Sequence, residues 1–329
     1  MTHGEATTGE GPAASAAADR AGRGGRFRVD ARGPFDREAA RASLVVHAVE
    51  GLHLLEGASA TMTRWVDVHG DPHAVTVRLD EAGAHVETST MDVNVNDVIA
   101  ARVRHWFDLD ADVSGIDAHL GADPLFAQQV RQRPGLRISR FQSAFEAVVM
   151  TVMGQQVTLR TSRLFDARLV AAFGADPPAV DGMPTLAPSP HDGADMGGDR
   201  SAGSHTAGLR LFPTPAVLAA VPLEELRATV RLTGSRARTV HEVAALFAEQ
   251  GDPDLLPPRE ELHAVHGIGP WTLDYLAIRG GTDPDAFPAG DAVLRRTLRD
   301  LDPAADADRV ATWSPYRSYA AARLWAAAV

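Results

Sequence analysis

The residues best suited to chemistry in this 329-residue sequence begin with a glycine-rich turn, GIG, at Gly267 to Gly269. A short amphipathic helix is expected before the turn, and Pro270 stands where a second helix would begin, a position at which its missing N–H costs nothing. Two glycines let the backbone approach a ligand closely, and the free N–H groups at the positive end of the second helix form a seat for a phosphate. The same pattern also fits an ordinary corner between two helices with a glycine cap.

A carboxylate follows at Asp291, in the segment DAFPAGDAVLRR. It comes after a proline- and glycine-rich approach and directly before an apolar helical run, so we expect it to be a helix N-cap. Capping alone would explain an aspartate at this place. Asp291 is nevertheless separated from the hairpin by only one helix and one loop, so a role beyond capping stays open.

Two aromatic residues stand one helical turn apart after the hairpin, Trp271 and Tyr275, and a third, Trp325, lies near the end of the sequence. Residues at i and i+4 share a helix face, so the first two are expected to lie side by side. Electron-rich rings can hold an electron-poor ring between them, although aromatic residues on amphipathic helices more often belong to the core.

The absence of two residue types excludes several kinds of chemistry. The sequence has no cysteine, which excludes disulfides, thiolate metal sites and cysteine-ligated iron–sulfur clusters. All 32 basic residues are arginines, so a mechanism that needs a lysine amine is excluded as well. The 13 histidines show no metal-ligand spacing. We therefore expect neither a catalytic metal nor a cofactor.

The formal net charge of −11 at first opposes a nucleic-acid partner. The arginines are nevertheless concentrated. Residues 131–170 hold seven arginines and two acidic residues, and residues 226–241 hold four arginines and no acid. These segments fit either solvated helix faces or a surface that contacts phosphates.

The segments that must position these residues predict an α+β protein. Residues 1–25 are low in complexity and are expected to be a disordered tail. Residues 26–115 combine a helical pattern at Arg37 to His47 with alternating runs such as HAVTVRLD, which predict a small α/β domain on antiparallel strands. Residues 116–329 predict an all-helical domain, interrupted at 175–208 by a Pro/Gly/Ser/Asp-rich stretch expected to be a mobile insertion.

Helical periodicity is followed through eight segments: 98–107, 143–173, 214–223, 226–250, 259–266, 270–280, 291–301 and 316–328. No apolar run approaches the roughly 20 residues that a membrane helix needs, and the N-terminus lacks the apolar core of a signal peptide. We therefore expect a cytoplasmic protein without a membrane partner, and a monomer by default.

These motifs and their flanking sequences resemble the helix-hairpin-helix DNA glycosylases, in particular the bacterial 3-methyladenine DNA glycosylase II enzymes. The resemblance rests on LHAVHGIGPWTLDYLAIRG, on the approach to Asp291, on FQSAFEAVVMTVMGQQVTLRTSRLF at Phe141 to Phe165 and on WSPYRSYAAARLW at Trp313 to Trp325. RVRHWFDLDAD and DPLFAQQVRQRPGLRI, nearer the N-terminus, also match. The resemblance covers nearly the whole sequence from about Phe35.

The resemblance implies a monofunctional glycosylase that removes alkylated bases from double-stranded DNA, with Asp291 as its catalytic carboxylate. A carboxylate beside the anomeric carbon stabilises an oxocarbenium-like transition state, and an alkylated purine leaves readily because it already carries positive charge. Bifunctional members attack the sugar with a lysine just after the hairpin, where this sequence has Trp271. Lyase chemistry is therefore disfavoured.

The resemblance also assigns residues to the site. The pocket for the flipped base would be lined by Gln155, Trp271, Tyr275 and Trp325. The residues implied to contact DNA are Gly267, Ile268, Gly269 and Thr272 in the hairpin and Gln156, which would fill the gap left by the extruded nucleotide. Gln156 departs from the family, in which this wedge is usually apolar.

Relatives also hold a monovalent cation on backbone carbonyls of the hairpin. The corresponding carbonyls here are those of His263, Val265 and Ile268, with His266 at a position where proline is common. Two other classes of function stay open on the sequence. One is a non-catalytic DNA-damage-binding protein, favoured by the polar wedge, and the other is a helical protein-interaction scaffold, favoured by the acidic net charge.

Overall fold

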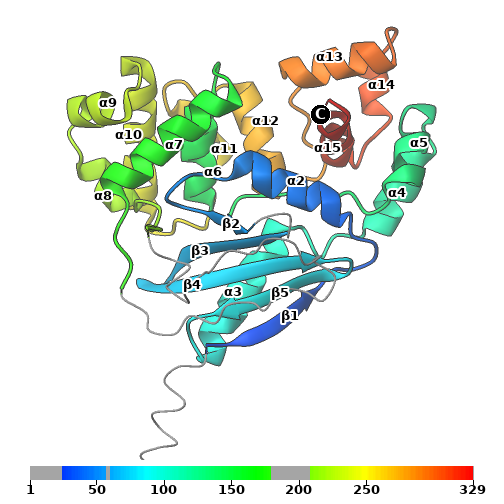
Figure 1. Ribbon diagram of the computed structural model, residues 1–329. Coiled ribbons are helices and arrows are strands. Elements are labelled where there is room, and N and C mark those ends of the chain that lie inside the picture. The colour runs from blue at the N-terminus through cyan, green and yellow to red at the C-terminus, as the bar shows by residue number, and fades with distance from the viewer. Residues whose placement is uncertain (1–23, 57–59, 179–207, 329) are drawn as a thin grey trace, which may run out of the picture.

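The computed structural model describes residues 24–56, 60–178 and 208–328. Almost all of the expected tail (1–25) and insertion (175–208) therefore lies outside the described residues. Within them, the predicted α+β class is confirmed, because one antiparallel sheet precedes a region made of helices (Figure 1). The division of the chain between residues 115 and 116 stays a prediction.

The sheet has five strands in the order β1-β5-β4-β3-β2, and each neighbouring pair is antiparallel. The strands are β1 (Arg26–Asp30), β2 (Leu54–Glu56), β3 (Thr61–Val68), β4 (Asp71–Asp80) and β5 (Gly83–Thr88). Met62 pairs with Val77, and Val77 pairs with Val86, which places three buried apolar side chains on the same face.

Helices α2 (Arg37–His47) and α3 (Val93–Trp106) both pack on this apolar face. Leu44 of α2 and Ile99 of α3 belong to the same buried cluster as Met62 and Val77. Both helices begin at an aspartate that accepts hydrogen bonds from first-turn N–H groups, Asp36 and Asp92. Side-chain capping and an apolar face thus define each helix locally.

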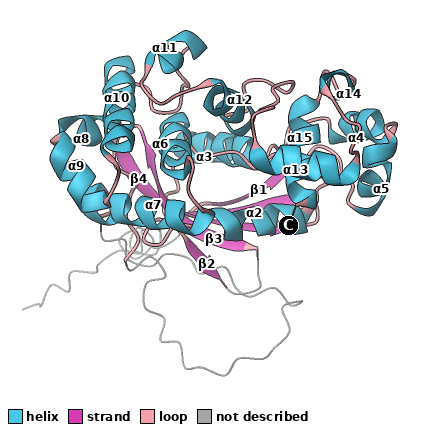
Figure 2. Cartoon of the chain, turned by 90° about the horizontal axis from the view of Figure 1, so that it is seen from above, coloured by secondary structure: helices cyan, strands magenta, loops and turns pink. Residues whose placement is uncertain are grey.

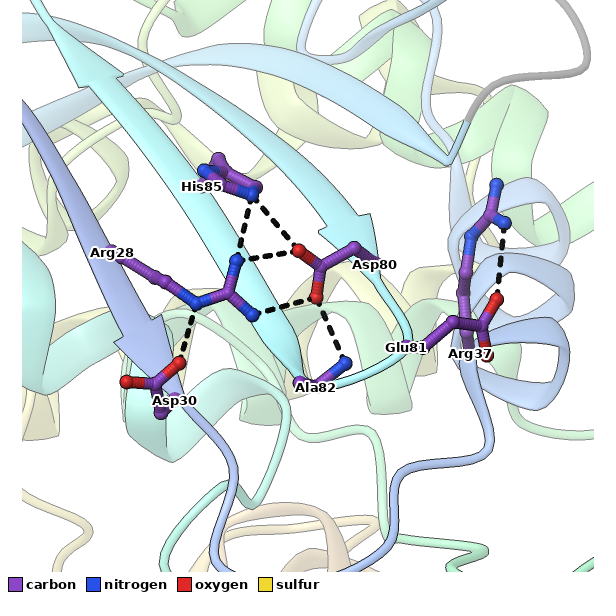
Figure 3. Close-up of polar contacts among 7 residues, drawn as sticks. All are labelled: Arg28, Asp30, Arg37, Asp80, Glu81, Ala82 and His85. Atoms are coloured by element: carbon purple, nitrogen blue, oxygen red, sulfur yellow. Dashed lines mark hydrogen bonds and ion pairs between the residues drawn. The ribbon is translucent and has the colours of Figure 1, made fainter. Parts of the chain in front are cut away.

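The edge of the sheet at β1 carries a network of ion pairs (Figure 3). Arg28 on β1 donates hydrogen bonds to Asp80 at 2.5 and 2.9 Å and to Asp30 at 2.5 Å. Partial burial works to raise the pKa of the Asp80 carboxyl, but hydrogen bonds from Arg28 and Ala82 outweigh it and hold that pKa well below its usual range. The β4–β5 turn is thereby tied to β1.

The helical region contains a first group of helices around one core. These are α6 (Ala144–Gly154), α7 (Leu159–Phe173), α8 (Pro215–Ala220), α9 (Leu223–Val230), α10 (Gly234–Gln250) and α11 (Arg259–Ala264). The long periodic run predicted at 143–173 is broken after Gly154, and the one at 226–250 is broken by Arg231, which is left-handed with φ 64°. The left-handed position at the second break is occupied by an arginine, and the next glycine, Gly234, comes only at the first residue of α10.

A second group of helices surrounds a separate core. These are α4 (Val113–Gly121), α5 (Pro124–Gln132), α13 (Ala292–Leu301), α14 (Ala307–Ala311) and α15 (Arg317–Ala327). Helix α12 (Pro270–Arg279) lies between the two groups (Figures 1 and 2). Leu273 and Leu276 belong to the first core, whereas Ala277 and Ile278 belong to the second. In the described parts of the chain, no helix is long and apolar enough to cross a membrane.

Buried polar contacts fix α15 in place. Arg323, with 1% of its side chain exposed, pairs with Asp117 of α4 at 2.5 Å. Tyr319 donates to Asp108 at 2.8 Å, and Arg140 donates to the other oxygen of the same carboxylate at 2.7 Å. Because α15 also carries Trp325, these contacts determine where that indole lies.

Asp166 on α7 is a buried carboxyl with few partners. Only 3% of the residue is exposed, and one of its oxygens accepts a hydrogen bond from the Ser162 hydroxyl at 3.4 Å. Its second oxygen has no hydrogen-bond partner among the described residues. Burial therefore raises the pKa of Asp166 well above its ordinary value, against the opposing effect of Ser162.

Replacing Asp166 by Asn should change how stability depends on pH. The unfolded carboxyl loses its proton near pH 4, before the folded one does, so the free energy of unfolding falls as pH rises from about 4 towards the raised pKa. Asp166→Asn removes this loss. The stability of the variant relative to the wild type should grow by about 1.4 kcal/mol per pH unit over that window.

Urea unfolding at pH 4 and at pH 7 measures the effect. The exposed Asp110→Asn variant serves as the control and should show no such trend, since its side chain is 73% exposed. An Asp166→Asn variant with the same stability difference at both pH values would contradict this account of Asp166.

Candidate active site

The turn between α11 and α12 is held by α10. Gly267 has φ 86°, and a Cβ atom there would lie 2.7 Å from the hydroxyl oxygen of Thr239. That hydroxyl donates to the carbonyl oxygen of His266 at 2.7 Å. Ile268 is 3% exposed and anchors the turn in the first core. Gly267 is therefore required both for its backbone conformation and for the close approach of Thr239.

The N-terminus of α12 is open. Gly269 is the N-cap and offers no side-chain hydrogen bond, and Pro270 occupies the first turn. No atom lies within 4 Å of the place where a Cβ of Gly269 would stand. The first-turn N–H groups thus combine the positive end of the helix dipole with space for an anionic group.

The three aromatic residues of the predicted pocket are in contact. Trp271 and Tyr275 stack on α12 with ring centroids 5.4 Å apart and an interplanar angle of 23°. Trp325 of α15 meets Tyr275 edge to face, at 5.7 Å and 66°. All three side chains are partly exposed. They form an aromatic wall that a planar ring can reach.

Asp291 lies against this wall. One carboxylate oxygen accepts hydrogen bonds from the N–H groups of Val293 and Leu294, both at 2.9 Å, and the other accepts the indole N–H of Trp271 at 3.0 Å. The indole nitrogen of Trp325 is 3.4 Å from the first oxygen. Every donor is uncharged, and none of the ion pairs among the described residues involves Asp291. The carboxylate is oriented without being neutralised.

Gln155 and Gln156 occupy the loop between α6 and α7. The Gln155 amide donates to the carbonyl oxygen of Gly267 at 3.1 Å and to the hydroxyl of Thr272 at 3.0 Å. Gln156 is exposed and has φ 55°, an uncommon conformation for a residue other than glycine. The loop is therefore fastened to the hairpin through Gln155 and presents Gln156 outward. The roles predicted for both residues stay predictions.

The carbonyls predicted to hold a monovalent cation already have some partners. The Val265 oxygen accepts the N–H of Ile268 at 3.2 Å, and the Ile268 oxygen lies 3.3 Å from Nδ1 of His263. Each carbonyl oxygen has a second lone pair, so a cation fits the donor set. The site stays a prediction.

Two residues beside the wall were missed by the sequence reasoning. The guanidinium carbon of Arg279 lies 5.9 Å from the centroid of the Tyr275 ring, and its Nη2 lies 2.8 Å from Nε2 of His47 on α2. Arg279 follows Tyr275 by four residues, so its place on the same helix face was available from spacing alone. Nothing local in the sequence marks His47, which lies 232 residues away.

A separate cavity of about 590 Å³ lies between the β3–β4 turn, α3 and the start of α6. It includes Asp254, whose pKa is raised by burial against the pull of Arg102, its partner at 2.6 Å. None of the residues predicted for the site lines this cavity. The chemistry that Asp291 and the aromatic wall offer is therefore located elsewhere.

Two family models match the chain. Residues 26–143 match the AlkA N-terminal domain, and residues 149–312 match the HhH-GPD superfamily base excision DNA repair protein. Together they extend over both the sheet and most of the helical region.

Curated relatives agree with these matches. The Mycobacterium tuberculosis (strain CDC 1551 / Oshkosh) protein named "Probable bifunctional transcriptional activator/DNA repair enzyme AlkA" is 32% identical over 311 residues, which cover 91% of this chain and 56% of that protein. The chain thus spans little more than half the length of this relative. DNA-3-methyladenine glycosylase 2 of Escherichia coli (strain K12) is 26% identical, over 78% of this chain and 82% of its own.

A solved structure shares the fold. The 3-methyladenine DNA-glycosylase from Archaeoglobus fulgidus superimposes with a TM-score of 0.70 at 16% identity, covering 91% of this chain and 97% of that one. The order of sheet and helices described above is therefore that of a known architecture.

The two glycines of the hairpin should respond differently to alanine. Gly267→Ala should lower the free energy of unfolding by about 1–3 kcal/mol, because it strains a positive φ and places a methyl group against Thr239. Gly269→Ala is the matched control and should change stability by no more than about 0.5 kcal/mol, since its φ is −102° and its surroundings are open. Urea unfolding of the two variants, compared with the wild type, measures both changes in the free energy of unfolding. Equal stabilities would contradict the close approach of Thr239.

Proposed function

The chain belongs to the HhH-GPD superfamily of base excision DNA repair proteins, and from this premise we propose that it is a DNA glycosylase which hydrolyses the N-glycosidic bond of alkylated bases. The observation that carries the proposal is the placement of Asp291: a carboxylate with no ion-pair partner among the described residues, held by Trp271 and by the start of α13 against the aromatic wall. The proposed partner is double-stranded DNA, bound by one copy of the chain.

The chemistry requires stabilisation of a positive sugar. As the bond between the anomeric carbon and the base breaks, the sugar approaches an oxocarbenium ion, and a carboxylate beside it lowers the barrier. Asp291 needs no rearrangement to do so, because three hydrogen bonds of 2.9 to 3.0 Å already orient it. Water then adds to the anomeric carbon and loses a proton.

The aromatic wall suits the proposed substrate. The bond between sugar and base can be hydrolysed in this way only after the base has left the stack of the duplex, and a flipped base is held by stacking. An alkylated purine is positively charged, and the faces of Trp271, Tyr275 and Trp325 carry the negative end of an aromatic quadrupole. The wall therefore favours a cationic base over an uncharged one.

The absence of lysine supports hydrolysis without strand cleavage. A lyase mechanism begins with an amine attacking the sugar to form a Schiff base, and none of the 329 residues is a lysine. The expected products are a free base and an intact strand with an abasic site.

The surface beside the hairpin offers charge to the DNA backbone. Arg160 and Arg163 on α7, and Arg231 and Arg238 at or near the start of α10, are exposed. None of these four arginines takes part in the ion pairs that the structure shows among its described residues. With the open N-terminus of α12, they support phosphate binding by a chain whose net charge is −11.

Asp291→Asn should abolish base release while sparing the fold and DNA binding. The variant keeps an oxygen for the cap of α13, and Asn caps helices about as well as Asp, so stability should fall by about 1 kcal/mol or less. Removal of the negative charge should slow base release by about 100-fold or more. Free base and strand breaks are measured separately on a methylated duplex, and binding is measured at low and high salt.

Asp306→Asn provides the matched control, because Asp306 caps α14 in the same manner, accepting the N–H of Arg309 at 3.0 Å, and should retain full activity. Equal losses of stability and activity in Asp291→Asn would identify Asp291 as a structural cap. A wild type that binds DNA without releasing base would be a damage-binding protein, for which the polar Gln156 would be the favouring feature. A wild type that fails to bind DNA even at low salt would refute the proposal altogether.

A further inference from the structure

Arg279 is a half-buried cation that has no anionic partner in the described parts of the chain. Its guanidinium lies over the rings of Tyr275 and Phe141, at 5.9 and 5.4 Å, and contacts His47. Its Nε is buried without a hydrogen-bond partner, and within residues 24–56, 60–178 and 208–328 no carboxylate pairs with it. By contrast, Arg64 and Arg140 pair with Glu146 and Asp108 at 2.5 and 2.7 Å. A buried charge is usually neutralised by a partner, so this exception suggests a role.

His47 does not reduce the charge of Arg279. Burial, reinforced by the positive charge of Arg279, lowers the pKa of His47 to about 3, so the imidazole is neutral near pH 7. Its Nε2 then accepts a hydrogen bond from the guanidinium at 2.8 Å, as a neutral ring can. The contact fixes the position of Arg279 and leaves its full unit of charge in place.

The charges on the two ends of the aromatic wall are opposite. Trp271, Tyr275 and Arg279 follow one another at i, i+4 and i+8 on α12, and therefore share one face of the helix. Trp271 donates to Asp291 at 3.0 Å, stacks on Tyr275, and Tyr275 in turn lies under Arg279. A fixed negative charge and a fixed positive charge are thus separated by two stacked rings.

We propose that Arg279 is a positioning residue that holds Tyr275 and supplies the positive end of an electric field along the breaking glycosidic bond. The proposal rests on the glycosylase function proposed above. Asp291 stabilises the positive charge that develops on the sugar, and Arg279 stabilises the electron density that moves onto the base.

The direction of the effect follows from the electron balance. The bond between the anomeric carbon and the base nitrogen breaks with both electrons leaving on the base, so a cationic alkylpurine departs as a neutral molecule. The positive charge of Arg279 repels the cationic base when it is bound. In the transition state the base has already gained electron density, so this repulsion is weaker. Arg279 therefore speeds the chemical step and opposes binding of a cationic base, a combination that simple structural support does not produce.

The test compares Arg279→Met, which keeps the length of the side chain and removes its charge, with Arg279→Lys, which keeps the charge. Single-turnover release of 7-methylguanine from a duplex is followed over a range of enzyme concentrations, which separates the chemical rate constant from the apparent Kd. Arg104→Met removes the same charge from α3, where the side chain of Arg104 is 42% exposed and pairs with Asp110 at 3.2 Å, and should behave as the wild type.

We expect Arg279→Met to slow the chemical step by about fivefold, as the loss of one partly screened charge would, without raising the apparent Kd. Arg279→Lys should stay within about twofold of the wild type. An unchanged rate in Arg279→Met, or equal slowing by Lys and Met, would overturn the proposal. Arg279→Gln replaces the Met variant if the latter fails to fold. A wild type that releases no base would instead refute the proposed function.

Discussion

Burial of α12 on two sides is the constraint on which the rest of the candidate site depends. Leu273 and Leu276 pack into one helical core and Ala277 and Ile278 into another, so the helix can neither rotate nor slide without exposing apolar side chains. The partly exposed face that remains carries Trp271, and with it the stack that extends to Arg279. The position of α12 therefore determines where the turn before it and the loop before α13 lie.

Asp291 shows how a capping residue can also be a chemical group. A capping carboxylate is oriented by backbone N–H groups, which are uncharged and so do not cancel its charge. The indole of Trp271 adds a third uncharged donor at 3.0 Å, and through it the cap is joined to the aromatic wall. The interpretations of Asp291 as a helix cap and as a reactive carboxylate are therefore compatible, because one geometry serves both.

The sequence predicts most strongly those features that depend on neighbouring residues. Helix Arg37 to His47 was predicted with the bounds that the structure has, and α12 begins at Pro270 as its fixed φ requires. Periodicity alone continued one helix through the break between α6 and α7, because nothing local shows that Gln155 is held by Gly267 and Thr272, more than 110 residues away. The contact of His47 with Arg279 was missed for the same reason. Trp271 and Tyr275 lie side by side as their spacing implied, whereas only the fold could reveal that His47 lies behind them, against Arg279.

An acidic protein can still bind DNA if its unpaired positive charges lie near the binding surface. Most arginines in the core and at the edge of the sheet are bound to carboxylates, as Arg28, Arg64 and Arg323 are, and contribute little to a field outside the protein. The net charge of −11 is therefore a poor measure of the electrostatic potential near the hairpin, where backbone N–H groups and exposed arginines have no such partners among the described residues. Within the site, too, a charge without an ion-pair partner contributes most to the local electric field. Asp291 and Arg279 each lack an ion-pair partner within the part of the chain that the structure describes, so their electric fields are not cancelled locally.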